Sequence, residues 1–293
     1  MFTIKKILFI INPISGVGKK NTIPPLIATY LSADKFSWDI KYTEKRKHGA
    51  EIASTEKENY DAIIAVGGDG SVNEIGSALI GHKCALGIIP CGSGNGLARH
   101  LHIPLKVKGA LQRIAEFNPF PIDTGLVNDK PFLGTCGFGF DAHVAEKFDS
   151  FGKRGFFSYA RLVIREYNRY QAPTFKITGK DIEIEKEAVM CSIANSSQFG
   201  NGFTISPNSD IQDGIFELVL LDRFGWLKAP AVSRKFFSKS IQSSKYFSSV
   251  AFKEELNITI PESDSVSYHI DGESLRGDGN FKIQIQPKSL TLL

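Results

Sequence analysis

Apolar and polar residues alternate in blocks over the first 122 residues of the chain. Short apolar runs, the pattern of buried strands, are separated by longer segments with helical spacing. The expected strands are residues 7–11, 36–43, 61–66 and 85–90, and the expected helices are residues 22–32, 48–57, 97–101, 106–117 and one that starts at Ser71. Strands that alternate with helices over short connections predict a parallel sheet covered by helices, with ligands at the carboxyl ends of its strands.

From Phe120 the pattern changes to short strands with few helices. The expected strands are residues 120–127, 132–138, 174–184, 188–194, 215–221, 256–260, 265–270 and 281–285, and helical interruptions are expected at 156–170 and 226–241. Such spacing predicts an antiparallel β-sandwich. We therefore expect an N-terminal α/β domain over residues 1–122, with residues 286–293 as a candidate completion, and a C-terminal β-sandwich domain over residues 123–285.

The charge of the chain is mild and unevenly spread. Residues 1–122 carry 15 Lys and Arg against 10 Asp and Glu, and the remainder carries 20 against 21. A surplus of five suits a polyanionic ligand such as a nucleotide, but it is too small to indicate nucleic acid.

The four cysteines show no C-x-x-C spacing and lie in apolar contexts, which indicates reduced thiols in a cytoplasmic protein. No apolar run approaches the roughly 20 residues that span a bilayer. We interpret the opening MFTIKKILFI as the first strand and not as a signal peptide.

Two glycine-rich turns follow two of the expected strands. GGDG occupies residues 67–70, and Ser71 with Glu74 matches a capping box that would start a helix at once. GSGNG occupies residues 92–96, directly before the expected helix at 97–101. Glycine permits close backbone approach, and a helix N-terminus attracts anions. The pair predicts a phosphate site, whereas a connecting turn without a ligand is the alternative for either turn alone.

Asp69 lies between the glycines of the first turn. A carboxylate there opposes anion binding unless a cation intervenes, so Mg²⁺ is implied. The alternative is an Asx turn that shapes the loop. The segment 16–20, GVGKK, fails the Walker A pattern because its glycines are two positions apart and Lys20 replaces the hydroxyl residue.

Together, GGDGS-x-N-E and GSGN resemble the diacylglycerol kinase and sphingosine kinase family. The resemblance implies an ATP- and Mg²⁺-dependent lipid kinase that transfers the γ-phosphate of ATP to the hydroxyl of a diacylglycerol-like or sphingoid-base-like lipid. The positions that match the family's nucleotide-binding residues are Asn12, Thr43, Gly67, Gly68, Gly70, Ser71, Val72, Asn73, Glu74 and Ser93.

The same resemblance assigns roles to acidic residues later in the chain. Glu273 of the D-G-E segment matches the family's general base, and Asp69 would act with it by organising the metal. Asp123 matches an aspartate in a water–Mg²⁺ network around Asp69. The segment that begins at Pro207 matches a loop that holds a structural Mg²⁺, through positions that correspond here to Asp210, Asp213 and Ile215. From the residues alone, both acidic segments are hairpin turns.

One position departs from the bacterial diacylglycerol kinases. Gly96 stands where they have an aspartate, which weakens the expectation of a full carboxylate network and moves the turn toward the GSGN-x-LA pattern of sphingosine kinases. Two other functions stay open. One is a kinase of a soluble acceptor, as in NAD kinases and phosphofructokinases, which share GGDG. The other is a nucleotide- or lipid-binding relative without catalysis.

Two further segments bear on the lipid. Phe138, Phe140, Asp141 and His143 match residues that border the lipid site in relatives. Residues 226–247 mix five aromatic side chains with five basic ones, which suits an anionic membrane interface, although a helix packed on the sandwich explains them equally well. We expect a lipid substrate at the membrane surface, transient peripheral attachment at the inner membrane surface, and either a monomer or a homodimer.

Overall fold

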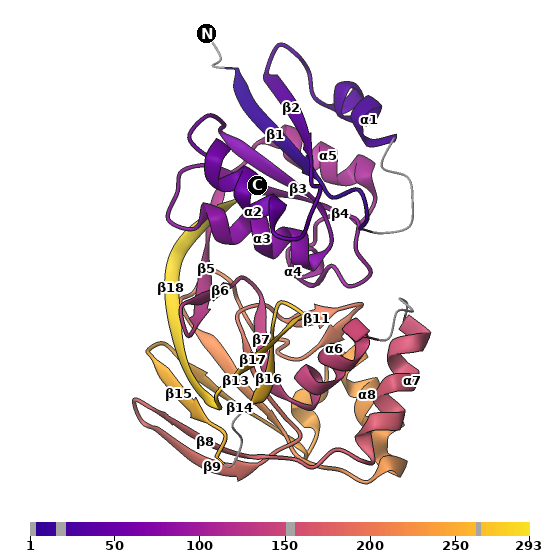
Figure 1. The fold of residues 1–293 in the computed structure, drawn as a ribbon, viewed down its shortest axis with the longest axis vertical. Helices are drawn as coiled ribbons and strands as arrows, with labels where there is room; N and C mark the ends of the chain where they lie inside the picture. Colours follow the sequence, from indigo (N-terminus) through magenta and orange to yellow (C-terminus); the bar gives the residue numbers. More distant parts are fainter. Residues whose placement is uncertain (1–3, 16–21, 151–155, 262–264) are drawn as a thin grey trace. The chain divides into compact units, whose positions relative to one another are not determined.

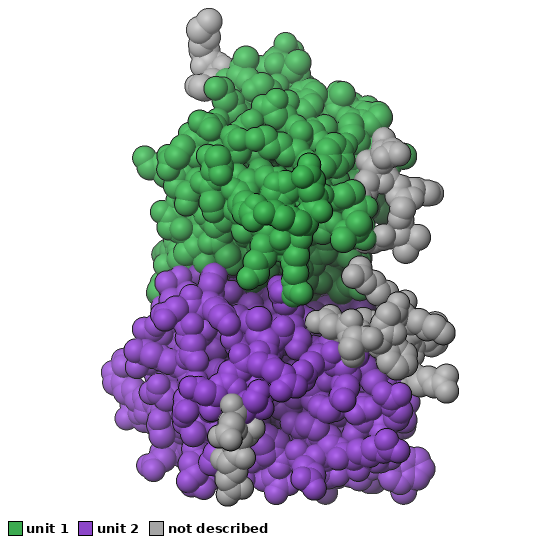
Figure 2. All heavy atoms as spheres, viewed as in Figure 1, with its two compact units in different colours: residues 1–123, 287–293 green, residues 124–286 purple. Residues whose placement is uncertain are grey.

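The computed structural model describes residues 4–15, 22–150, 156–261 and 265–293 (Figure 1). The chain divides into two compact units, residues 1–123 with 287–293, and residues 124–286, which Figure 2 colours separately. The Walker-like segment at 16–20 lies outside the described residues.

Unit 1 alternates strands and helices. Its elements are β1 (Lys5–Ile11), α1 (Ile23–Tyr30), β2 (Phe36–Tyr42), α2 (His48–Glu56), β3 (Ala62–Gly67), α3 (Asp69–Leu79), β4 (Ala85–Pro90), α4 (Gly96–His100) and α5 (Val107–Glu116). The strands pair in the order β2-β1-β3-β4, all parallel, and Leu292 near the end of the chain pairs with Leu86 on β4. All residues of β3 and β4 are buried, as expected of a parallel sheet that helices cover on both faces.

The two strands β5 (Phe120–Val127) and β18 (Asn280–Leu292) carry the chain from one unit to the other. Unit 2 contains both strands and helices. Its other strands are β6 (Lys130–Phe132), β7 (Thr135–Gly139), β8 (Thr174–Gly179), β9 (Ile182–Glu187), β10 (Met190–Ala194), β11 (Gln198–Gly200), β12 (Phe203–Thr204), β13 (Phe216–Leu221), β14 (Phe247–Phe252), β15 (Leu256–Thr259), β16 (Val266–Ile270) and β17 (Glu273–Gly277). Its helices are α6 (Phe140–Ser150), α7 (Phe156–Tyr167), α8 (Ala229–Phe237) and the 3₁₀ turns η2 (Trp226–Lys228) and η3 (Ile241–Ser243).

Two antiparallel layers form the core of unit 2. One layer is the six-stranded sheet β14-β13-β10-β7-β16-β17, and the other contains β18, β15, β8 and β9. Successive residues of β13 face opposite sides, as a strand requires. Leu218 and Leu220 lie in the core between the layers, and Val219 and Leu221 pack in a second cluster with Val232 of α8. The structure thus confirms a parallel α/β domain followed by an antiparallel sandwich.

Several local predictions were wrong. The run 174–184 is a hairpin, because Lys180 and Asp181 form a turn between β8 and β9 and Asp181 adopts a φ of 57°. The helix expected over 226–241 is divided into η2, α8 and η3. α6, β14 and β17 were not predicted.

The expected capping box at the start of α3 is also absent. The helix begins at Asp69 with Gly68 as its N-cap, so Ser71 is already its third residue and cannot cap it.

Candidate functional site

The two glycine turns of unit 1 contact each other through their backbones. A Cβ atom on Gly92 would lie 2.6 Å from the Cα of Gly68, and one on Gly68 would lie 3.1 Å from the Cα of Gly92. The Cys91 amide donates to the Gly67 carbonyl at 2.7 Å. The turns therefore form one compact structure at the carboxyl ends of β3 and β4.

Asn95, which the sequence analysis did not select, shapes the second turn. It is buried with a left-handed φ of 52°, and its side-chain amide accepts a hydrogen bond from Gly92 N at 2.9 Å and donates one to Gly92 O at 2.8 Å. Asparagine tolerates this backbone conformation and can close a turn on itself. The GSGN pattern carried this signal.

Asp69 joins the two turns. Its carboxylate oxygens accept hydrogen bonds from the amides of Asn95 at 2.8 Å and Gly96 at 2.7 Å. The carboxylate thus stabilises the start of α4, as the loop-shaping alternative expects.

Gly70 differs from the other glycines of the first turn. A Cβ added to Gly67 would touch the side chain of Ser71, and one added to Gly68 would touch the backbone of Gly92. A Cβ on Gly70 would meet nothing within 4 Å. Packing inside the described protein therefore requires Gly67 and Gly68 but not Gly70.

Two predicted nucleotide-binding residues are held by neighbouring loops. Asn12 follows β1, donates through its side chain to the Ser71 hydroxyl at 3.1 Å and accepts from Ile14 N at 3.1 Å. Glu74 accepts from Lys47 N at 2.9 Å.

The remaining predicted nucleotide-binding positions lie near the same sheet edge. Thr43 follows β2 and donates its amide to the Ile11 carbonyl at 2.9 Å. Val72 and Asn73 lie in the first half of α3, and Val72 is buried. Ser93 is exposed in the second turn. Because parallel strands end at one edge, these positions gather in unit 1 around the contacting turns.

The D-G-E segment of unit 2 is a two-residue hairpin turn. Ile270 on β16 pairs with Glu273 on β17, and Asp271 and Gly272 between them have φ values of 47° and 85°, as in a type I′ turn. The Asp271 carboxylate accepts the amides of Leu133 and Gly134 at 2.8 Å and of Thr135 at 2.9 Å. Asp271 is therefore structural, and Glu273 is partly exposed beside it.

The predicted metal loop of unit 2 consists of two Asx turns. Asp210 accepts from Gln212 N at 3.0 Å, and Asp213 accepts from Ile215 N at 2.8 Å. These bonds shape the loop, and its role as a metal site stays a prediction. Across the described part of the chain, no three His, Cys, Asp or Glu side chains converge as a candidate metal group.

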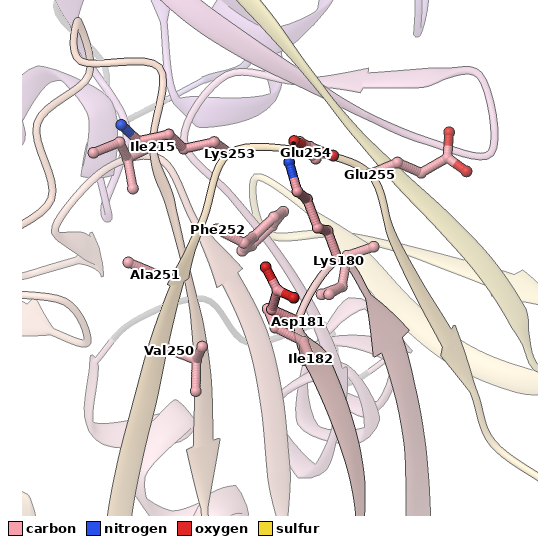
Figure 3. Close-up of a pocket in the computed structure, with 11 residues that line it drawn as sticks. Lys180, Asp181, Ile182, Ile215, Val250, Ala251, Phe252, Lys253, Glu254 and Glu255 are labelled. Carbon is pink, nitrogen blue, oxygen red and sulfur yellow. Dashed lines mark hydrogen bonds and ion pairs between the residues drawn. The ribbon is translucent and has the colours of Figure 1, made fainter.

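Ile215 also lines a cavity of about 450 Å³ beside the β8–β9 turn and residues 250–256 (Figure 3). Its lining includes the Lys180–Glu254 ion pair at 2.6 Å. The wall of the cavity therefore carries an ion pair as well as Ile215.

Of the residues expected near a lipid, Phe138 packs in the core and Asp141 forms polar contacts. Phe138 is fully buried in the sandwich, with its ring 4.6 Å from that of Phe281. Asp141 accepts from Ser192 at 3.0 Å and contacts His269 Nε2 at 3.1 Å. This buried polar cluster was not predicted, because its members come from three separate segments of the chain.

Phe140 and His143 lie at the start of α6. The Phe140 ring packs edge-on against Tyr167, and His143 Nε2 lies 3.1 Å from Glu166 Oε2. Hydrogen bonds from His143 and Arg165 lower the pKa of Glu166.

Asp123 is fully buried and accepts the Lys288 amide at 2.7 Å. It therefore ties the returning end of β18 to β5 within unit 1. Its expected role in a metal network stays a prediction.

The described residues contain no helix that is long and apolar enough to cross a membrane. Cys84, Cys136 and Cys191 are buried, Cys91 is half-buried, and none of the four forms a disulfide. Burial raises the pKa of Cys84 to about 12 and raises those of Cys136 and Cys191 as well.

Comparisons with known proteins agree with this arrangement. Residues 6–127 match the diacylglycerol kinase catalytic domain, and residues 134–293 match the YegS C-terminal NAD kinase beta sandwich-like domain. A protein of Yersinia enterocolitica named "Probable lipid kinase YegS-like" is 31% identical over 240 residues, with 78% of this chain and 77% of that protein covered. A Yersinia pestis protein of the same name is 30% identical over 235 residues, with the same coverage.

A solved structure shares the fold of the whole chain. It is that of a diacylglycerol kinase from Bacillus anthracis, with a TM-score of 0.78 and 22% identity over 100% of this chain and 97% of that one.

Proposed function

Because the chain belongs to the YegS-like lipid kinase family, we propose that it transfers the γ-phosphate of ATP to the primary hydroxyl of a membrane lipid. The proposed acceptor is diacylglycerol-like, and a sphingoid base is the alternative within the same chemistry. Mg²⁺ would accompany the nucleotide, and the product would enter phospholipid metabolism.

The open space around Gly70 is the main support for a nucleotide site. Gly70 lies in the first turn of α3, its φ is not positive, and none of the residues that the structure describes occupies the space of a Cβ atom. Glycine inside a helix costs up to about 1 kcal/mol relative to alanine, so a ligand that needs the space accounts for it. The N-terminus of α3 supplies amides and a positive dipole end, which favour a phosphate group at this position.

Asp69 and Glu273 divide the remaining roles in this proposal. Asp69 holds the second turn against the first through Asn95 and Gly96, and a carboxylate is the kind of ligand that Mg²⁺ takes together with water and phosphate oxygens. Bound Mg²⁺ would neutralise charge on the transferred phosphoryl group. Glu273 would accept the proton of the attacking lipid hydroxyl, oriented by the Asp271–Gly272 turn.

Calorimetric titration of ATP in the presence of Mg²⁺ tests the nucleotide site. Gly70→Ala should weaken ATP binding at least tenfold, which is about 1.4 kcal/mol, without lowering the melting temperature. Gly225→Ala is the matched control, because its Cβ would also meet nothing within 4 Å and its φ of −64° accepts alanine. Unchanged ATP affinity in Gly70→Ala would show that the turn only connects two elements.

Radiolabelled transfer from ATP tests the acceptor. The panel contains diacylglycerol and sphingosine in mixed micelles, with NAD and fructose 6-phosphate as soluble acceptors. We expect label in a lipid product. Label in a soluble acceptor alone would contradict the proposal.

A further inference from the structure

Unit 2 presents a group of exposed hydrophobic side chains on α7, η2 and α8. Ile164 is 72% exposed, Trp226 66%, Leu227 71% and Phe237 46%. These four residues, here called the α7–α8 patch, are half of the eight large hydrophobic side chains that are exposed in the described part of the chain. Helices α7 and α8 are labelled in Figure 1, and η2 directly precedes α8 in the chain. A tryptophan and a leucine that protrude side by side indicate a contact surface.

The α7–α8 patch is held in place by ordered contacts beneath it. The Tyr167 ring stacks on Phe224 at 5.0 Å, and its hydroxyl donates to Phe224 O at 3.0 Å and accepts from Phe224 N at 3.1 Å. The Arg223 guanidinium donates to the Tyr170 carbonyl at 2.7 Å. These bonds fix the chain directly before Trp226 to the end of α7. Ile164 lies one turn before Tyr167 on the same helix face.

Helix α8 is anchored from its other side. Val232 and Phe236 are buried, and the Phe236 ring stacks on Phe203 at 4.2 Å. Because these side chains hold α8 inward, Phe237 stays at the surface. The hydrophobic side chains of the patch are therefore presented on a supported surface.

A strongly basic segment surrounds the patch. From Arg223 to Phe252 the chain has six Lys and Arg and no Asp or Glu, whereas the rest of residues 123–293 has 14 against 21. Lys228, Arg234 and Lys239 are exposed, and none of them pairs with a carboxylate among the described residues. Positive charge is thus concentrated where the hydrophobic side chains protrude.

We propose that the α7–α8 patch docks the protein on an anionic phospholipid membrane. Trp226 and Leu227 enter the interfacial region, where tryptophan is favoured, and the basic side chains contact lipid phosphates. A second copy of the chain fits less well, because a two-fold interface would place the two basic segments against each other. The proposal rests on the proposed function, since a kinase of a membrane lipid has to reach its acceptor at a bilayer.

Fluorescence of Trp226 tests the docking surface directly. The chain has two tryptophans, so Trp38→Phe leaves Trp226 as the only one. The probe is a vesicle of phosphatidylcholine with phosphatidylglycerol, without ATP or diacylglycerol. We expect a blue shift of the emission, quenching by brominated acyl chains, and loss of both in high salt or with phosphatidylcholine alone. Emission that the anionic vesicles leave unchanged would overturn the proposal.

Vesicle sedimentation with variants provides the second test. Trp226→Ser with Leu227→Ser, and separately Lys228→Glu with Lys239→Glu, should reduce vesicle binding at least tenfold without changing the melting temperature or ATP affinity. Leu105→Ser is the control, because Leu105 is 42% exposed in unit 1. Wild-type sedimentation of both double variants would overturn the proposal. So would light scattering that shows a wild-type dimer and a monomeric serine double variant.

These measurements separate the docking surface from the kinase activity. Vesicle binding without phosphate transfer would support the docking surface and contradict the proposed function. Normal phosphorylation of a monomeric short-chain diacylglycerol by the serine double variant, together with loss of activity on vesicles, would assign the defect to docking.

Discussion

The backbones of Gly68 and Gly92 touch: a Cβ atom on Gly92 would lie 2.6 Å from the Gly68 Cα. The two residues are 24 positions apart in the sequence, and each belongs to a turn that follows a buried strand. A backbone atom cannot move aside as the end of a side chain can. The contact therefore requires glycine at position 92, disfavours a side chain at position 68, and fixes the distance between the turns.

We expect Gly92→Ala to destabilise unit 1 by about 1–3 kcal/mol, the range for an overpacked contact. The added methyl group must push the two turns apart, so ATP binding should weaken as well. Thermal denaturation with Gly70→Ala as the space-tolerant control measures the effect. A melting temperature equal to that of the wild type would show that the turns separate without cost.

The sequence predicted these turns but not the reason for their glycines. The φ of Gly68 is −94°, which any residue adopts, so the requirement for glycine comes from the contact with Gly92. Ser71 and Glu74 matched a capping box, but they accept hydrogen bonds from Asn12 and from the amide of Lys47. Contacts of this kind depend on which strands become neighbours, and local spacing does not contain that information.

Glu273→Gln should lower turnover by roughly 100-fold or more while ATP affinity and melting temperature stay near wild type, because a general base is lost and no packing changes. Steady-state kinetics on lipid substrate with calorimetry measures both. Asp271→Asn is the contrasting variant: it weakens an acceptor of three amides and should lower the melting temperature. Near-wild-type turnover in folded Glu273→Gln would remove Glu273 as the base.

The D-G-E turn could be predicted from the sequence only in part. The D-G-E letters predicted a hairpin turn, and the structure contains a type I′ turn there. The partners of Asp271 at residues 133–135 lie in a different strand connection, so its structural role was not visible in the sequence. Strands with continuous apolar runs, such as β3 and β4, were predicted within one residue because burial on both faces dictates their composition.

Thiol labelling gives an independent measure of the turns. Cys84, Cys136 and Cys191 are buried and their pKa values are raised, so we expect a thiol reagent at pH 8 to label only Cys91 in the native protein. Cys91 directly precedes Gly92, so ATP should slow its labelling. The Cys91→Ser variant is the control, and rapid labelling of a native Cys91→Ser protein would contradict this assignment.

Glu217 on β13 is half-buried, and burial raises its pKa above the ordinary value of 4.5. The folded state then binds this proton more tightly than the unfolded state. Stability from this group is therefore lost as the pH rises from 4.5 through the raised pKa. Glu217→Gln should melt at a higher temperature than wild type at pH 7, and the difference should shrink below about pH 4.5. Exposed Glu183→Gln is the control, and a pH-independent difference would refute the explanation.

Gly96→Asp tests the departure from the bacterial pattern. Gly96 is buried at the start of α4, and its amide donates to Asp69 at 2.7 Å. A carboxylate at this position would add negative charge close to Asp69, and like charges disfavour each other unless a cation lies between them. We expect the wild type to be active without this carboxylate, and Gly96→Asp to change the Mg²⁺ dependence by an amount on the order of 1 kcal/mol. Gly96→Asn has nearly the same size without the charge, so the difference between the two variants isolates the electrostatic effect from the effect of the added side chain.

Titration of Mg²⁺ against lipid phosphorylation measures the Mg²⁺ dependence of each variant. Identical Mg²⁺ dependence in both variants would show that charge at position 96 does not reach the metal. If the wild type is inert and only Gly96→Asp transfers phosphate to lipid, the proposed activity fails for the natural sequence, and a nucleotide- or lipid-binding role without catalysis takes its place.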